Sequence, residues 1–204
     1  LNALLGQPVL PVKVNPCTAI LTEVEYGDVP SVEVRWRDGS VESGTIDWFL
    51  ETFQLRTASW TDAGAEAKDR FGEIDRAVLR YPLELLRNGV VLLDTPGLDD
   101  DDARTARTLS SLADADAVIV VLSANRFLTE LERRTIRRNL LPLGLTNLFF
   151  PVTMVDLLDA ISDDPERELA DLTSRAREVL GPLCQHDGDR FGERFFPLDA
   201  RGAL

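Results

Sequence analysis

Three short, wholly apolar runs separated by helical patterns constrain the fold of this chain more than any other feature. The runs cover residues 90–93 (VVLL), 117–122 (AVIVVL) and 148–152 (LFFPV). Runs of this kind are typical of strands that are buried on both faces of a sheet. Helical patterns cover residues 103–112, 129–139 and 165–180. This alternation predicts an α/β fold, a three-layer sandwich with a mostly parallel sheet between helices.

Two alternating segments near the start predict an antiparallel hairpin at the edge of that sheet. Residues 18–26 and 31–37 are rich in β-branched side chains and alternate apolar with charged positions. Residues 27–30 (GDVP) supply the turn residues between them. A length of 204 residues suits one α/β domain, so we expect residues 1–204 to form a single domain.

The net charge argues against two kinds of binding surface. The net charge is −13, which argues against a nucleic-acid surface and against direct binding of this chain to an anionic membrane. Arginines at 133, 134, 137 and 138 form the nearest basic group; a solvated helix face is the favoured interpretation, and a contact surface for a partner is the alternative. Two distant cysteines indicate neither a disulfide framework nor a zinc site, which fits a cytoplasmic protein.

The strongest motif follows the first apolar run. The run ends in Asp94, and a turn containing Pro96 and Gly97 follows at once. An aspartate in this position can order the shell of a Mg²⁺ ion, and a glycine lets its backbone N–H approach a phosphate. The simpler alternative is a strand end with a capping aspartate.

Several segments, in order, resemble the bacterial dynamin-like GTPases. Residues 1–6 (LNALLG) are similar to the helix after that family's phosphate-binding loop, and residues 15–19 (NPCTA) to its first switch. Residues 86–98, from LRNGV to DTPGL, resemble the approach to its second switch. The resemblance implies a P-loop NTPase-like fold that binds GTP and Mg²⁺. It also implies that Thr18 is the catalytic switch threonine and a Mg²⁺ ligand, although Thr18 could simply begin a strand.

The same resemblance places a base-reading segment after the third run. Asp156 matches the aspartate that accepts hydrogen bonds from guanine, and Thr153 matches the first position of that motif. Met154 stands where the family has lysine, which removes a charge but keeps apolar packing. Ala200 matches a residue whose backbone approaches the base, while Asp199 replaces the family's serine.

No Gly-x-x-x-x-Gly-Lys-Ser/Thr loop occurs in the sequence. By resemblance, this loop and the first strand precede Leu1, so the chain is interpreted as a partial G domain. The favoured function is then GTP binding and hydrolysis in a longer parent, with the segment alone inactive. Resemblance also implies homodimers formed through G domains, and membrane remodelling through regions outside this segment, at the inner membrane face. A non-catalytic pseudo-GTPase module, and a regulatory GTPase that does not act on membranes, are the alternatives.

Overall fold

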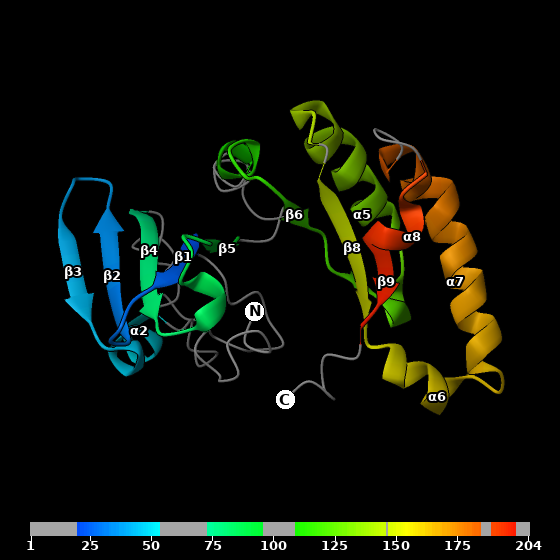
Figure 1. The fold of residues 1–204 in the computed structure, drawn as a ribbon, viewed down its shortest axis with the longest axis horizontal. Coiled ribbons are helices and arrows are strands. Elements are labelled where there is room, and N and C mark those ends of the chain that lie inside the picture. The colour runs from blue at the N-terminus through cyan, green and yellow to red at the C-terminus, as the bar shows by residue number, and fades with distance from the viewer. Residues whose placement is uncertain (1–19, 54–72, 96–108, 146, 185–188, 199–204) are drawn as a thin grey trace, which may run out of the picture. The chain divides into compact units, whose positions relative to one another are not determined.

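The computed structural model describes residues 20–53, 73–95, 109–145, 147–184 and 189–198, which fall into two compact units. Leu1–Thr108 forms the first unit and Leu109–Leu204 the second. Each unit has its own sheet (Figure 1), so the α/β class is confirmed, with mixed rather than mostly parallel strand pairing. A single domain over residues 1–204 stays a prediction.

The first unit contains a five-stranded sheet in the order β3-β2-β4-β1-β5. Its strands are β1 (Thr22–Tyr26), β2 (Ser31–Trp36), β3 (Val41–Gly44), β4 (Ile74–Tyr81) and β5 (Leu92–Asp94). Strand β1 runs parallel to β4 and antiparallel to β5. Strand β2 runs antiparallel to both β3 and β4, so an antiparallel hairpin does lie at the edge of the sheet, but it consists of β2 and β3.

The predicted hairpin between residues 18–26 and 31–37 is wrong, because β4 lies between β1 and β2. Cross-strand ion pairs support this arrangement. Arg80 of β4 contacts Glu25 of β1 at 2.8 Å and Glu33 of β2 at 3.5 Å. Strand β4 thus places an arginine between a glutamate of β1 and a glutamate of β2, and such opposite-charge pairs on neighbouring strands stabilise a sheet by roughly 0.2–1 kcal/mol each.

Gly27 lies where the chain leaves β1 to reach β2 on the far side of β4. Its backbone N–H donates to the carbonyl of Tyr81 at 3.3 Å, at the end of β4. A Cβ atom at position 27 would lie only 2.6 Å from the Cβ of Arg80. The close approach of two backbones therefore requires a residue without a side chain at this point.

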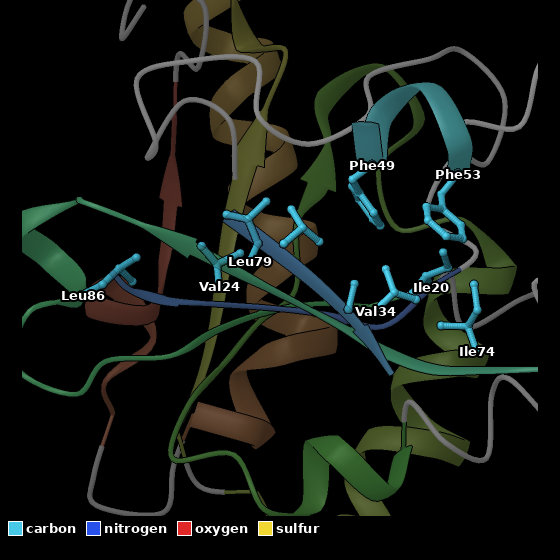
Figure 2. Close-up of a cluster of buried hydrophobic side chains, with 10 residues drawn as sticks. Ile20, Val24, Val34, Phe49, Phe53, Ile74, Leu79 and Leu86 are labelled. Carbon is cyan, nitrogen blue, oxygen red and sulfur yellow. The ribbon is translucent and has the colours of Figure 1, made fainter. Parts of the chain in front are cut away.

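Helix α2 (Ile46–Phe53) packs on the apolar face of this sheet. Figure 2 shows Phe49 and Phe53 of the helix above the side chains of the strands. Phe53 also contacts Trp48 edge-to-face, with ring centroids 5.5 Å apart. The buried cluster includes Ile20, Val24, Val32, Val34, Ile74, Ala77, Leu79 and Leu86. Aromatic and aliphatic burial on one face thus holds the first unit together.

The second unit is built on β8, which pairs in parallel with every other strand described in this unit. Its strands are β6 (Val118–Ile119), β7 (Leu122–Ser123), β8 (Leu148–Thr153) and β9 (Phe195–Pro197). Its helices include α5 (Glu130–Thr135), η3 (Ile136–Leu140), η4 (Leu141–Leu143), α6 (Leu158–Ile161), α7 (Pro165–Leu180) and α8 (Phe191–Arg194). The alternation of parallel strands with helices confirms the prediction for this half of the chain.

Two of these helices begin at strong capping residues. Helix α7 has the predicted bounds: the Asp164 side chain accepts from the N–H of Arg167, and Pro165 occupies the first turn. Helix α5 begins with a capping box between Thr129 and Glu132. It continues as the π-helix η3, so residues 129–139 are helical as predicted but not a regular α-helix throughout.

The prediction of strands buried on both faces is wrong for two runs. In residues 90–93, Val90 is 39% exposed and Val91 is 49% exposed. Residues 117–122 differ from the prediction in the same way. Val118 and Leu122 are buried, whereas Ile119 is 58% exposed and Val121 61% exposed. The run therefore alternates as a strand with one covered face, because within the described residues only one side of it is packed. Across the described residues, we also find no helix of the length and apolarity needed to cross a membrane.

We expect Gly27→Ala to lower the free energy of unfolding of the first unit by about 1–3 kcal/mol, because the new methyl group overpacks against Arg80. Urea unfolding followed by tryptophan fluorescence measures this change, since all three tryptophans precede residue 61. The control is Val29→Ala in the same connection, where the side chain is exposed and its loss should change stability by less than about 0.5 kcal/mol. Equal stability of the two variants would contradict the close approach at Gly27.

Candidate functional site

The carboxyl ends of three strands meet at one edge of the second sheet. Ser123 at the end of β7 is the register partner of Thr153 at the end of β8. The Thr153 hydroxyl donates to the carbonyl of Leu122 at 3.1 Å. On the other side of β8, the N–H of Leu198 donates to the carbonyl of Val152 at 2.8 Å. In open parallel sheets, ligands bind outside this end of the strands.

Met154 makes the turn that leads out of β8. Its φ is 59°, in the left-handed region that few residues other than glycine adopt. The carbonyl of Met154 accepts from the N–H of Leu157 at 3.2 Å, and the Ser123 hydroxyl lies 3.4 Å from its sulfur. The side chain is 45% exposed. A strained, exposed residue in a fixed turn is an arrangement found at ligand sites.

Asp156 follows in the short helix η5 (Val155–Leu157) and is half-buried. It lines a pocket of about 300 Å³ together with Val155, Leu158, Asp159, Pro165, Glu166 and Leu169. The turn at Met154 therefore brings Thr153 and Asp156 to the same edge of the sheet. The assignment of either residue to base recognition stays a prediction.

Asp94 lies at the end of β5 in the first unit, opposite Thr22 of β1. Burial raises the pKa of its carboxyl group above the ordinary value. The residue is half-buried, and no hydrogen bond to its carboxylate is found within the described ranges. A hard cation such as Mg²⁺ fits an oxygen ligand of this type. The hydroxyl of Thr22 donates to the carbonyl of Ile20 at 3.2 Å, which gives Thr22 a role within the strand.

Several predicted site residues lie outside the described residues: Thr18, Gly97, Asp199 and Ala200. Their roles stay predictions. Among the residues that are described, no group of three or more His, Cys, Asp or Glu side chains could hold a metal ion. A Mg²⁺ ion held by one or two protein oxygens and by substrate phosphates needs no such group.

The sequence interpretation missed two residues of this edge. The Ser123 hydroxyl lies 2.9 Å from Oδ1 of Asn125, in the short helix η2 (Ala124–Arg126), as well as close to Met154. The sequence offers one signal for these residues: the apolar run ends at residue 122, directly before Ser123. The residues after such a run lie beside those after its parallel neighbour, because carboxyl ends of parallel strands share one edge.

Comparisons with known proteins identify a family and several relatives of this chain. The family model described as the dynamin family matches residues 1–155. The bacterial dynamin-like protein of Nostoc punctiforme is 34% identical over the whole of this chain, which covers 30% of that protein. The isoniazid-induced protein IniA of Mycobacterium tuberculosis is 29% identical over 68% of this chain, which covers 21% of IniA.

A solved structure also shares the fold. It is part of an oligomerised bacterial dynamin pair, described as a mechanism for long-range sensing and tethering of membranes. It matches with a TM-score of 0.62 at 22% identity, covering 99% of this chain and 31% of the other. The chain thus spans about a third or less of these relatives.

The raised pKa of Asp94 leads to a prediction about stability and pH. A carboxyl group whose pKa is raised by folding destabilises the fold when ionised, and this cost disappears as the pH falls through the folded-state pKa. Without metal ions, we therefore expect Asp94→Asn to raise the free energy of unfolding at pH 7. Urea unfolding at a series of pH values, followed by tryptophan fluorescence, measures the difference.

The difference between the unmodified chain and Asp94→Asn should shrink toward low pH. Glu51→Gln, which neutralises an exposed carboxylate of α2, is the control and should show no such pH-dependent gain. A loss of stability in Asp94→Asn at pH 7 would contradict a cost of partly burying this carboxylate in its ionised form.

Proposed function

Because this chain belongs to the dynamin family, we propose that it supplies the base-reading and metal-organising residues of a GTPase. GTP is hydrolysed by attack of water on the terminal phosphorus. The bond from that phosphorus to the bridging oxygen breaks and leaves GDP and phosphate. The observation that carries the proposal is the meeting of the carboxyl ends of β7, β8 and β9 beside Asp156.

Asp156 reads the base in this proposal. One carboxylate accepts two hydrogen bonds, from N1–H and from the N2 amino group of guanine; adenine lacks this donor pair. Thr153 fixes the start of the segment through its hydrogen bond to the carbonyl of Leu122 at 3.1 Å. Met154 offers apolar packing to the base, and the backbone of Ala200 approaches the guanine oxygen.

Asp94 and Thr18 organise Mg²⁺, and the backbone N–H of Gly97 approaches the terminal phosphate. The support for Asp94 is its burial, which a nearby cation would compensate. When bound, Mg²⁺ neutralises negative charge on the phosphates. Thr18 would respond to the presence of the terminal phosphate, as switch residues do.

The remaining phosphate ligands would come from elsewhere in the full-length protein, because the sequence contains no Gly-x-x-x-x-Gly-Lys-Ser/Thr loop. Pairing of two G domains and a role in membrane remodelling are likewise proposals about that protein. They are supported by the oligomerised bacterial dynamin pair that shares this fold. Met154 in place of lysine favours one alternative, a non-catalytic module that binds nucleotide weakly or not at all.

The first test concerns Asp156 in the full-length protein. We expect Asp156→Asn to shift the preference from GTP toward xanthosine triphosphate, because an amide can donate to the xanthine oxygen at position 2. Competition binding with a fluorescent GTP analogue measures the ratio of the affinities for GTP and xanthosine triphosphate. We expect this ratio to change at least tenfold, which corresponds to about 1.4 kcal/mol. Asp159→Asn, three residues further along in α6, is the matched control. An unchanged preference would remove Asp156 from the base-reading role.

The second test concerns Met154. We expect Met154→Lys to raise the affinity for GTP about two- to fivefold, because a cation over an aromatic face contributes about 0.5–1 kcal/mol at an exposed site. Isothermal titration of the full-length protein measures this change. Met154→Gln, of similar length and without charge, should bind no more tightly than the unmodified protein. No GTP binding and no turnover in any of these proteins would favour the non-catalytic alternative.

A further inference from the structure

Met154 carries an exposed thioether at the edge where the strands of the second sheet end. It is the only methionine of the chain, and its side chain is 45% exposed. In the part of the chain that the structure describes, the other sulfur atom belongs to Cys184, which is fully buried. Burial raises the pKa of the Cys184 thiol and so keeps it in its less reactive protonated form. An oxidant that reaches these residues therefore meets the sulfur of Met154 first.

The two sides of this sulfur differ in their surroundings. The Ser123 hydroxyl lies 3.4 Å from the sulfur, which is contact distance. Pairing of β7 with β8 fixes the position of Ser123, and the turn at Met154, with φ of 59°, fixes where the methionine side chain begins. Ser123 thus covers one lone pair of the sulfur and leaves the other accessible from solvent.

We propose that Met154 is a site of reversible oxidation by peroxides, at which one sulfoxide epimer forms in excess and weakens nucleotide binding. The accessible lone pair attacks one oxygen of hydrogen peroxide, an S–O bond forms, and the O–O bond breaks to release hydroxide. The proton on the transferred oxygen passes to this hydroxide, so the products are a sulfoxide and water. Sulfur loses two electrons and the peroxide gains them. Two thiols of a reductase return two electrons and become a disulfide, and the oxygen leaves as water.

The effect on nucleotide binding rests on the proposed function, in which Met154 packs against the base and Asp156 reads it. Oxidation converts an apolar thioether into a polar sulfoxide. A sulfoxide pressed against the base loses its hydrogen bonds to water, so the oxidised side chain packs less favourably there. The oxidation step itself needs no nucleotide and can be measured without one.

The epimer ratio of the sulfoxide tests the site directly. The full-length protein is treated with hydrogen peroxide, digested and analysed by mass spectrometry, and reductases specific for each epimer give the ratio at Met154. We expect an excess of at least about twofold in the folded protein, because Ser123 covers one lone pair, and about equal amounts in urea. Ser123→Ala should bring the ratio in the folded protein toward equality. Ser40→Ala makes the same change at an exposed serine of the first unit and should leave the ratio unchanged.

GTP affinity tests the consequence of oxidation. We expect peroxide treatment to weaken GTP binding by the full-length protein about three- to tenfold, and reduction of the sulfoxide to restore it. Met154→Leu keeps an apolar side chain of similar size but has no thioether. Peroxide should therefore not change the GTP affinity of this variant from the value that it has before treatment.

Several outcomes would overturn the inference. Equal epimers in the folded protein, an unchanged ratio in Ser123→Ala, or oxidation of Cys184 before Met154 would remove the oxidation site. Complete oxidation of Met154 with unchanged GTP affinity, or an equal loss of affinity in Met154→Leu, would remove its effect on binding. A protein that binds no GTP before treatment contradicts the proposed function and this effect together, whereas the epimer ratio still decides the oxidation site. Far-UV circular dichroism checks that the variants are folded, and the comparison with urea tests the site without any substitution.

Discussion

The parallel pairing of β8 is the constraint on which the second unit depends. Phe150 and Val152 of this strand are fully buried, and β6, β7 and β9 all pair with it in the same direction. A register slip of one residue would turn these side chains to the other face, so burial fixes the register. Because all the strands run the same way, their carboxyl ends reach one edge together. Packing in the sheet interior is therefore enough to place Thr153 beside Ser123.

The turn at Met154 shows where local preference is overridden. A left-handed conformation costs a residue with a Cβ atom about 1–2 kcal/mol, and a glycine there would avoid the cost. Methionine occupies the position, exposed and with its sulfur near the Ser123 hydroxyl. Residues kept in unfavourable conformations against such a cost concentrate at functional sites. The turn also redirects the chain so that Asp156 enters η5 at the sheet edge rather than continuing away from it.

Helices and strands with strong local signals could be predicted from the sequence. Which strands pair with one another could not. The bounds of α7 follow from the cap at Asp164 and from its helical period, and residues 148–152 fall within β8. The predicted pairing of the first two alternating segments failed because alternation shows which face is apolar but does not identify the neighbouring strand. Arg80, more than 40 residues beyond β2, contacts both Glu25 and Glu33 from the strand that lies between them. The sequence did not indicate Ser123 for the same reason, because Ser123 lies at the site only where β7 pairs with β8.

Charged side chains are arranged differently in the two units, so the net charge of the whole chain does not describe the charge at any one surface. In the first unit, arginines of β4 lie between glutamates of β1 and β2, so opposite charges neutralise each other across strands. In the second, Arg134, Arg137 and Arg138 are all exposed on the helix formed by α5 and η3. Fields of exposed charges are screened within about 8–10 Å in physiological salt. A surface that approaches these three arginines therefore meets a local cluster of cations, although the total charge is −13. Because the same screening limits the reach of the total charge, a net charge of −13 bears on solubility more than on which surface binds at this helix.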